Sequence, residues 1–278
     1  MAQLIIVSLI WAFSFGLIKR HLGGVDSTFV TAARLGLALL VFLPFLRVRG
    51  VGQRTLLNLA AIGAVQFGLM YLAYIESFRY LRAYEAALFT ITTPIFVTLF
   101  ADALERTLRP RALVAALLAV IGTALVMVKS TDLNVTLTGL ALVSCSNAAF
   151  AIGQVWYRHV RTREPALRDR DVFALLYASA FAVAAIAMLI KGVTIKLTAP
   201  QVGTLLYLGV LASGLGFFLW NVGATRVSAG TLAVMNNAKV PLAVAVALLV
   251  FGEKANLPSL AASLAVLGFA VWLASRRS

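Results

Sequence analysis

The chain has 278 residues, of which 62% are hydrophobic and only 12% are charged, and its formal net charge is +14 at pH 7. A soluble domain is about half apolar and a quarter charged, so this composition excludes an ordinary water-soluble fold and predicts an integral membrane protein. The positive charge is explained by basic residues in short connections between spans, and no separate basic module for nucleic acid is present.

Ten apolar runs are long enough to cross about 30 Å of hydrocarbon. They lie at 3–19, 28–46, 56–76, 84–103, 110–128, 137–157, 171–190, 200–221, 227–250 and 257–275. The connections between them are short, and none could form a domain outside the membrane. A continuous apolar run must satisfy its own backbone hydrogen bonds in lipid. The sequence therefore predicts an all-α integral membrane protein with ten transmembrane helices.

The orientation follows from the first run and from the basic residues. No basic residue precedes the apolar run that follows Met1, so we expect a retained span rather than a signal peptide. Lysines and arginines are more numerous in the connections on the side of the chain ends, for example in "RHVRTREPALRDRD" after the sixth run. By the positive-inside rule, we expect a multi-pass protein of the inner (plasma) membrane with both termini in the cytoplasm.

The second half of the chain resembles the first. When Pro241 is laid over Pro94, Arg226 falls on Arg79 and Asn221 falls on Tyr74. Each half holds five runs, and an odd number means that the halves enter the membrane in opposite directions. We therefore predict two inverted five-helix repeats, 1–131 and 132–278, around a central cavity, an architecture typical of secondary transporters.

The usual signatures of catalysis and of metal binding are missing from the sequence. It contains no phosphate-binding loop, no H-E-x-x-H and no G-x-S-x-G, so we do not expect an enzyme. Cys145 is the only cysteine, which excludes an internal disulfide, and the two histidines lack the spacing of a metal site. We expect no metal and no cofactor.

Lys239 is the most informative single residue. It lies near the centre of the ninth run, where an ionised lysine costs about 2.5–3.5 kcal/mol, so it should face the bundle interior or water. We interpret it as a docking charge for a carboxylate; the alternatives are a structural ion pair or carbonyl contact, and a neutral, desolvated amine. Asn236 and Asn237 stand beside it. Pro241 and Pro94 each remove a backbone donor, and we expect paired helix interruptions, with a simple packing kink as the alternative.

Other polar and aromatic side chains lie on shared helical faces. Tyr71 and Tyr74 follow Phe67 along one face of the third run, with Gln66 beside them. Aromatic stripes are more often packing, but deep tyrosine hydroxyls need partners. The predicted substrate-binding residues are Trp11, Gln66, Tyr71, Tyr74, Asn147, Gln154, Asn221, Asn236, Asn237 and Lys239, with Pro94 and Pro241 as the helix interruptions. We expect Arg34 to reach a span end, with a structural or gating role, and Trp156 and Trp220 to anchor at the interface.

Acidic residues fall in connections or at span ends, so no carboxylate marks a proton pathway at the membrane centre. This pattern weakens proton coupling and leaves facilitated transport open. It also disfavours purely cationic substrates, which would need an anionic partner.

The sequence resembles the EamA-type branch of the drug/metabolite transporter superfamily. The resemblance covers nearly the whole chain and depends on "IWAFSFGLIKRH", "FVTAARLGLALLVFLPF" and the duplicated stretches "AYEAALFTITTPIFVTLFADALE" and "SAGTLAVMNNAKVPLAVAVALLVFGE". Within this branch the chain looks most like the YddG-type amino-acid exporters. The resemblance implies a basket in which spans one to four and six to nine surround the cavity, while spans five and ten brace the outside.

The resemblance also implies the activity, a secondary transporter that exports amino acids, aromatic and other large neutral ones, by alternating access. Lys239 and the neighbouring asparagines would meet the carboxylate, and the aromatic residues would meet the side chain. The alternatives are an exporter of drugs or other small metabolites of the same superfamily, and a membrane scaffold or sensor without flux. The expected partners are the substrate and the lipid bilayer, and the sequence does not decide between a monomer and a homodimer.

Overall fold

The computed structural model describes residues 1–22, 24–77, 79–81, 89–127, 136–193, 195–251 and 257–275. Within these ranges every regular element is a helix, and there is no strand. The elements of the first half are α1 (Ala2–His21), α2 (Ser27–Phe42), η1 (Leu43–Phe45), α3 (Gln53–Gly63), η2 (Ala64–Leu69), α4 (Met70–Ser77), α6 (Thr93–Glu105) and α7 (Pro110–Met127). Those of the second half are α8 (Leu137–Arg163), α9 (Asp169–Lys191), α10 (Ala199–Leu206), η3 (Tyr207–Leu215), α11 (Gly216–Ala224), α12 (Ala229–Phe251) and α13 (Leu257–Ser275).

The described helices confirm a multi-pass membrane protein. Six helical stretches are long and apolar enough to cross a bilayer. They are Ser27–Phe45, Gln53–Ser77, Leu137–Arg163, Asp169–Lys191, Ala199–Ala224 and Pro258–Ser275, and two shorter apolar helices are Ala2–Ser14 and Pro110–Leu125. Large apolar side chains such as Leu40 and Ile190 are exposed on the outside of the bundle, where lipid would cover them.

Two of the long spans change helix type in their middle. The π-helical segments η2 and η3 lie inside Gln53–Ser77 and Ala199–Ala224, the third and eighth predicted runs. A π-helix bonds residue i to i+5, so backbone carbonyls at its ends are left for other donors. The indole Nε1 of Trp11 donates to the Ala212 carbonyl at 2.8 Å. The Tyr177 hydroxyl lies 2.6 Å from the Gly214 carbonyl oxygen. Side chains of α1 and α9 thus stabilise the irregular backbone of η3.

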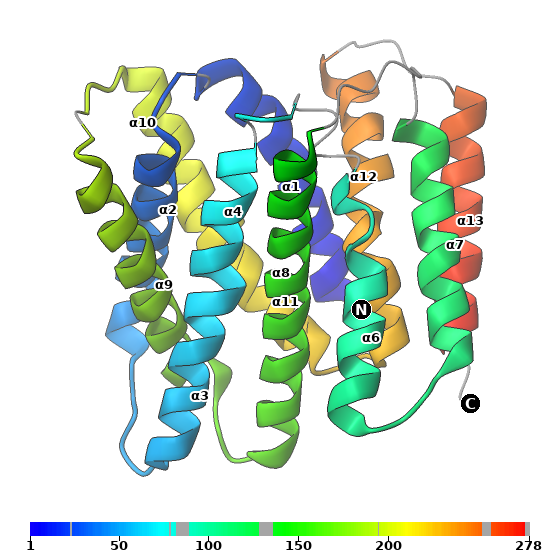
Figure 1. Ribbon diagram of the computed structural model, residues 1–278, viewed down its shortest axis with the longest axis horizontal. Helices are drawn as coiled ribbons and strands as arrows, with labels where there is room; N and C mark the ends of the chain where they lie inside the picture. The colour runs from blue at the N-terminus through cyan, green and yellow to red at the C-terminus, as the bar shows by residue number, and fades with distance from the viewer. Residues whose placement is uncertain are drawn as a thin grey trace.

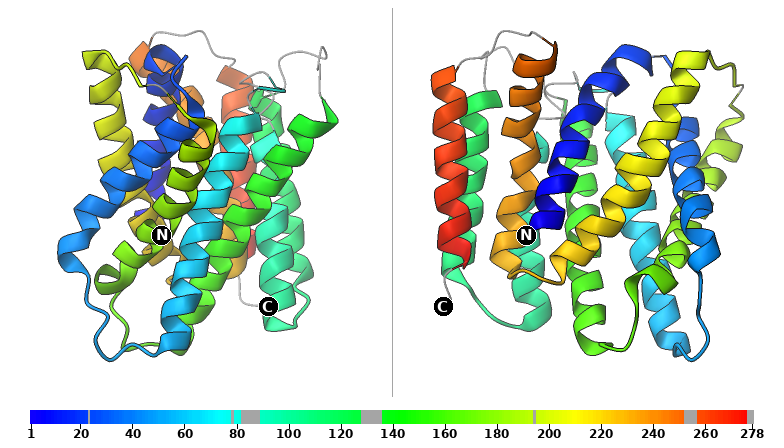
Figure 2. Two further views of the ribbon diagram at one scale, coloured as in Figure 1. Left: turned by 60° about the vertical axis from the view of Figure 1, so that its left-hand side comes forward. Right: turned by 180° about the vertical axis from the view of Figure 1, so that it is seen from behind.

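The helices form one bundle, seen from three sides in Figures 1 and 2. α7 and α13 pack against each other at one edge, while α2 packs against α9 toward the other edge. α1 contacts α11 and α12, and α8 contacts α4 and α6. The middle of the bundle is therefore built from helices of both halves of the chain.

The two ends of the bundle differ in what they carry. In Figure 1 the C-terminus and the connections α2–α3, α6–α7 and α8–α9 lie at the lower end, and α1 starts in the half nearest that end. We call this the terminal end, and the other the far end. At the terminal end the backbone N–H of Arg47 donates to the Asp171 carbonyl at 2.7 Å, which joins the α2–α3 connection to α9.

The two prolines act differently. Pro94 lies in the first turn of α6, and residues 91–92 before it form a turn rather than a helix. Pro241 lies inside α12, which continues as a helix on both sides of it. A proline inside a helix removes one hydrogen bond without necessarily ending the helix. We expected an interruption at both prolines. The structure has a break before Pro94 and a continuous helix through Pro241.

Asp26 joins two helices at the far end and predicts a pH effect on stability. Its carboxylate caps α2 by accepting from the Thr28 and Phe29 backbone N–H groups, and it pairs with Lys191 of α9 at 2.6 Å. Partial burial acts to raise the pKa of Asp26, but the hydrogen bonds from Lys191, Thr28 and Phe29 outweigh it and lower the pKa from 3.8 to about 2.

Because this pKa is lowered by folding, the carboxylate stabilises the protein above about pH 4, and the contribution is lost as the pH falls toward 2. We expect Asp26→Asn to lower the thermal midpoint in detergent at pH 7. Asparagine still caps a helix, so the difference isolates the charge. The gap to the native chain should close between about pH 4 and pH 2. A gap that stays constant over this range would contradict the assignment.

Candidate functional site

The bundle encloses a cavity with an empty volume of about 730 Å³, counted to its open mouth. Its walls come from both halves of the chain. The lining residues are Trp11, Ser14, Ile18, Arg34, Met70, Tyr71, Tyr74, Thr90, Thr93, Ser146, Asn147, Phe150, Phe217 and Lys239.

Five of the predicted site residues meet at this cavity: Trp11, Tyr71, Tyr74, Asn147 and Lys239. They come from α1, α4, α8 and α12, which are far apart in the sequence. Each was predicted because it is a polar or aromatic group deep in an apolar run. The structure brings the five together at one cavity, and their role in binding stays a prediction.

Lys239 reaches the cavity beside aromatic rings. Its Nζ lies 5.3 Å from the centre of the Trp11 ring and 6.0 Å from that of Phe150. A ring face attracts a cation but cannot neutralise it or accept strong hydrogen bonds. No aspartate or glutamate is among the lining residues that the structure describes. The ammonium group therefore remains available for an incoming anion.

Arg34 is a second cation on the wall. Its expected position at a span end is wrong, whereas its bonds to neighbouring helices agree with the expected structural role. The residue is only 6% exposed and lines the cavity, so its guanidinium points into the bundle instead of out to the membrane surface. Its Nε donates to the Ser213 Oγ at 3.1 Å, and its Nη2 donates to the Tyr71 hydroxyl. Arg34 thus ties α2 to α4 and η3. A guanidinium has five N–H donors, so these two bonds leave others for a ligand.

Aromatic rings form the apolar part of the wall. The Trp11 ring centre lies 5.5 Å from that of Phe217 and 6.1 Å from that of Phe150. The Trp220 ring packs behind it at 5.0 Å and is fully buried. The interfacial position expected for Trp220 is therefore wrong, because its indole faces the bundle interior instead of the membrane surface. Phe150 and Phe217 were missed, since apolar residues in apolar runs give no signal.

Four of the predicted amides contact one another instead of the cavity. Gln66 Nε2 donates to Asn221 Oδ1 at 3.1 Å, and Gln154 and Asn236 lie 3.3 Å apart. The indole of Trp220 donates to Gln154 Oε1 at 2.9 Å. All are buried. We call Gln66, Gln154, Trp220, Asn221 and Asn236 the amide belt. The Gln66 Oε1 is buried without a described partner. A contact of these amides with substrate stays a prediction.

Asn147 and Asn237 hold the broken stretch before α6. The Nδ2 of Asn147 donates to the Phe89 carbonyl at 2.9 Å, and that of Asn237 donates to the Ile91 carbonyl at 2.8 Å. The Thr90 carbonyl, which Pro94 deprives of its helical donor, accepts from the Thr93 hydroxyl at 2.6 Å. Irregular backbone at membrane depth requires such partners. Asn237 therefore supports the cavity wall and is not itself among the lining residues.

The cavity, the amide belt and an ion pair follow one another along α8. Ser146, Asn147 and Phe150 line the cavity, Gln154 belongs to the belt, and Arg158 pairs with Glu105 at 3.0 Å. α8 runs from the far end to the terminal end in Figure 1. The cavity thus lies on the far side of the belt, and the protein is packed between the cavity and the terminal end.

Comparison with known proteins gives consistent matches. The model of the EamA-like transporter family matches residues 1–128 and again residues 137–275. A protein of Salmonella typhimurium named "Biotin transporter" is 42% identical over 277 residues, covering 98% of this chain and 92% of that protein. The Escherichia coli protein of the same name gives the same values. A "Probable biotin transporter" of Pseudomonas aeruginosa is also 42% identical, with 96% of its length covered. One crystal structure has a TM-score of 0.80 over the whole chain at 20% identity, which supports the fold alone.

Proposed function

The chain belongs to the EamA-like transporter family and is a membrane transporter, and from this premise we propose that its substrate is biotin or a closely similar small carboxylate. The proposal depends on one observation: two cationic residues, Lys239 and Arg34, line the same cavity, and its other described lining residues are neutral. A carboxylate would neutralise this charge in a place where an unpaired ion is costly.

The cavity chemistry favours biotin over the amino acids that the family resemblance suggested. An amino acid carries an ammonium group beside its carboxylate, and that group would have to approach the two cations. Biotin has one carboxylate, an apolar chain with a thioether ring, and a neutral ureido group. The aromatic wall of Trp11, Phe150 and Phe217 suits the apolar part. The hydroxyl and amide groups of Thr93, Ser146 and Asn147, for example, suit a neutral polar head. The names of the relatives agree with this choice.

We further propose that ten spans form two inverted repeats, 1–131 and 132–278. Three observations support this. The family model matches the chain twice, on either side of residues 129–136. The π-helical segments η2 and η3 occupy the third and eighth spans. The contacts between the halves are also reciprocal, as a two-fold axis requires. α1, the first helix of the first repeat, packs on α11 and α12, and α8, the first helix of the second repeat, packs on the corresponding helices α4 and α6. Both chain ends would face the cytoplasm of the inner membrane, so the cavity faces outward.

Uptake into proteoliposomes tests the substrate. We expect the purified chain to give saturable uptake of radiolabelled biotin. Excess free biotin should block this uptake, and biotin methyl ester should compete only weakly, because the ester lacks the negative charge. Empty liposomes are the control. Folded protein that moves no biotin, or that is blocked equally by acid and ester, would contradict the proposal.

Amino-acid export is the second candidate, favoured by the aromatic rings beside a cation that could receive a carboxylate. The same liposomes decide between the two. If phenylalanine or tryptophan is transported and biotin does not compete, the amino-acid assignment replaces the biotin assignment. Uptake with and without a proton gradient then tests coupling.

A further inference from the structure

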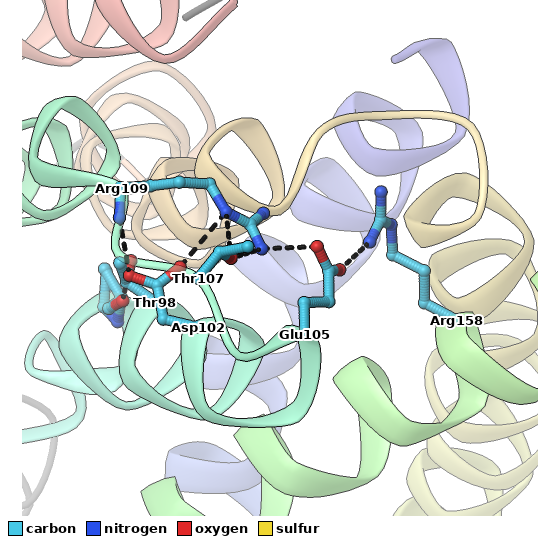
Figure 3. A network of polar contacts seen from close by, with 7 residues as sticks. Thr98, Asp102, Glu105, Thr107, Arg109 and Arg158 are labelled. Atoms are coloured by element: carbon cyan, nitrogen blue, oxygen red, sulfur yellow. Dashed lines mark hydrogen bonds and ion pairs between the residues drawn. The ribbon is translucent and has the colours of Figure 1, made fainter.

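An ion-pair network lies at the terminal end, where α6 ends (Figure 3). The Glu105 carboxylate accepts from Arg109 on one side and from Arg158 Nη1 at 3.0 Å on the other. Arg109 also pairs with Asp102 at 3.2 Å through its Nε and donates its backbone N–H to that carboxylate. Arg109 therefore ties the α6–α7 corner together. The bond to Arg158 is different because it leaves this corner and reaches α8, in the other half of the chain.

The bond between Glu105 and Arg158 joins the two helices that flank the closed side of the cavity. Thr93, at the start of α6, lines the cavity, as do Asn147 and Phe150 on α8. The side chains of Arg158 and Glu105 are 25% and 35% exposed, so water reaches the pair only in part. A partly buried pair between charged groups is stronger than a fully exposed one.

α6 has the form of a lever. It begins directly after the turn at residues 91–92, where Pro94 prevents a continuous helix and Asn147 and Asn237 hold the backbone. Such a break is a place where a helix can change direction. The Glu105 side chain is at the opposite end of the same helix. A small rotation at the break therefore moves Glu105 furthest from Arg158.

A groove lies beside the pair, between α6 and α8. It is lined by Phe100, Ala103, Leu104, Ile152, Val155 and Trp156 and is open to the outside of the bundle, where lipid would cover it. Among the described side chains at this level, the ion pair of Glu105 and Arg158 is the polar contact that joins α6 to α8.

From this geometry we propose that Glu105 and Arg158 form the latch of the gate at the terminal end. The inference rests on the proposed transport function. In the described state the latch is closed and the cavity lies on the far side of the amide belt. The latch breaks when the cavity opens toward the terminal end. Glu105 keeps Arg109 as a partner when this happens, so its carboxylate is not left alone.

Labelling of an introduced cysteine tests the latch without any substrate. Ala151 lies on α8 between Asn147 and Gln154 and is fully buried. The Ala151→Cys substitution is made in a Cys145→Ala chain, and the protein is placed in vesicles with its terminal end facing the outside. A membrane-impermeant maleimide is then added to the outside. We expect slow labelling, and about tenfold faster labelling after Glu105→Gln or Arg158→Gln. The double variant should be no faster than either single one, because both remove the same bond.

Two matched variants serve as controls. Glu76→Gln removes a carboxylate that pairs with Arg79 at 2.7 Å, remote from the α6–α8 contact. Arg109→Gln disrupts the α6–α7 corner and leaves Arg158 and Glu105 in place. Neither should speed labelling by more than about twofold, since neither breaks the bond between the halves. The latch is rejected if both Glu105→Gln and Arg158→Gln label at the native rate, or if the controls match them. Because labelling needs no transport, a gate that opens in a chain without biotin uptake would contradict only the proposed substrate.

Discussion

Replacing Lys239 by methionine is expected to raise the KM for biotin uptake by about tenfold to hundredfold while folded protein is still made. A hydrogen bond to a charged group contributes about 1.5–3 kcal/mol, and each 1.4 kcal/mol is roughly a factor of ten. Methionine keeps the length and the apolar stem that packs near Trp11 and Phe150, so the change removes mainly the charge. Initial uptake rates over a range of biotin concentrations give the KM.

Two comparisons make this result specific. Lys196→Met removes an exposed lysine in the α9–α10 connection and should leave the KM unchanged. Biotin methyl ester should compete weakly with biotin in the native chain and no more weakly in the Lys239→Met chain, because the group that Lys239 meets is already absent. An unchanged KM in Lys239→Met, or an equal loss with Lys196→Met, would assign the carboxylate to another residue.

A second large effect is expected for Gly153→Ala, on stability instead of affinity. A Cβ at Gly153 would lie 2.1 Å from the Gln66 Cβ and 2.9 Å from the Gln66 Cα, and the backbone of η2 cannot move aside easily. Overpacking costs about 1–3 kcal/mol and more when backbone must shift. We expect the thermal midpoint in detergent to fall by at least about 5 °C, given a few degrees per kcal/mol for a chain of this size.

Gly203 in α10 and Gly268 in α13 provide the controls for this prediction. Neither has an atom within 4 Å of an added Cβ. Gly203→Ala and Gly268→Ala should keep or slightly raise the thermal midpoint, because alanine is favoured over glycine in a helix by about 1 kcal/mol. If the thermal midpoint of Gly153→Ala equals those of the two controls, α8 does not approach η2 as closely as described.

The helical fold could be predicted because the bilayer imposes it. Backbone groups in lipid must bond within their own segment, so each apolar run had one outcome. The π-helical segments could not be predicted in this way. Their sequences, "AVQFGL" and "YLGVLASGL", are as apolar as the neighbouring turns. What stabilises η3 is the donor groups of Trp11 and Tyr177, which come from other helices.

The location of a candidate site residue could be predicted only where its side chain has a single favourable environment inside a membrane protein. A lysine deep in a span must find a cavity, and Lys239 did. The hydrogen bonds of a buried glutamine or asparagine can be made equally well by a ligand or by another amide. Gln154 and Asn236 form a hydrogen bond with each other. Arg34 was misjudged because depth was counted along one helix, whereas its partners Tyr71 and Ser213 come from two others.

The indole of Trp11 has two roles, and its fluorescence is sensitive to both. Its ring lines the cavity, and its N–H is bound to the Ala212 carbonyl of η3. An occupant that shifts the ring alters this bond, and with it the polarity and rigidity around the indole. The chain has only four tryptophans, and the Trp220 ring centre lies 5.0 Å from that of Trp11. The emission spectrum of the unlabelled protein should therefore report occupancy directly, so affinity becomes measurable by titration in detergent, separately from movement across a membrane.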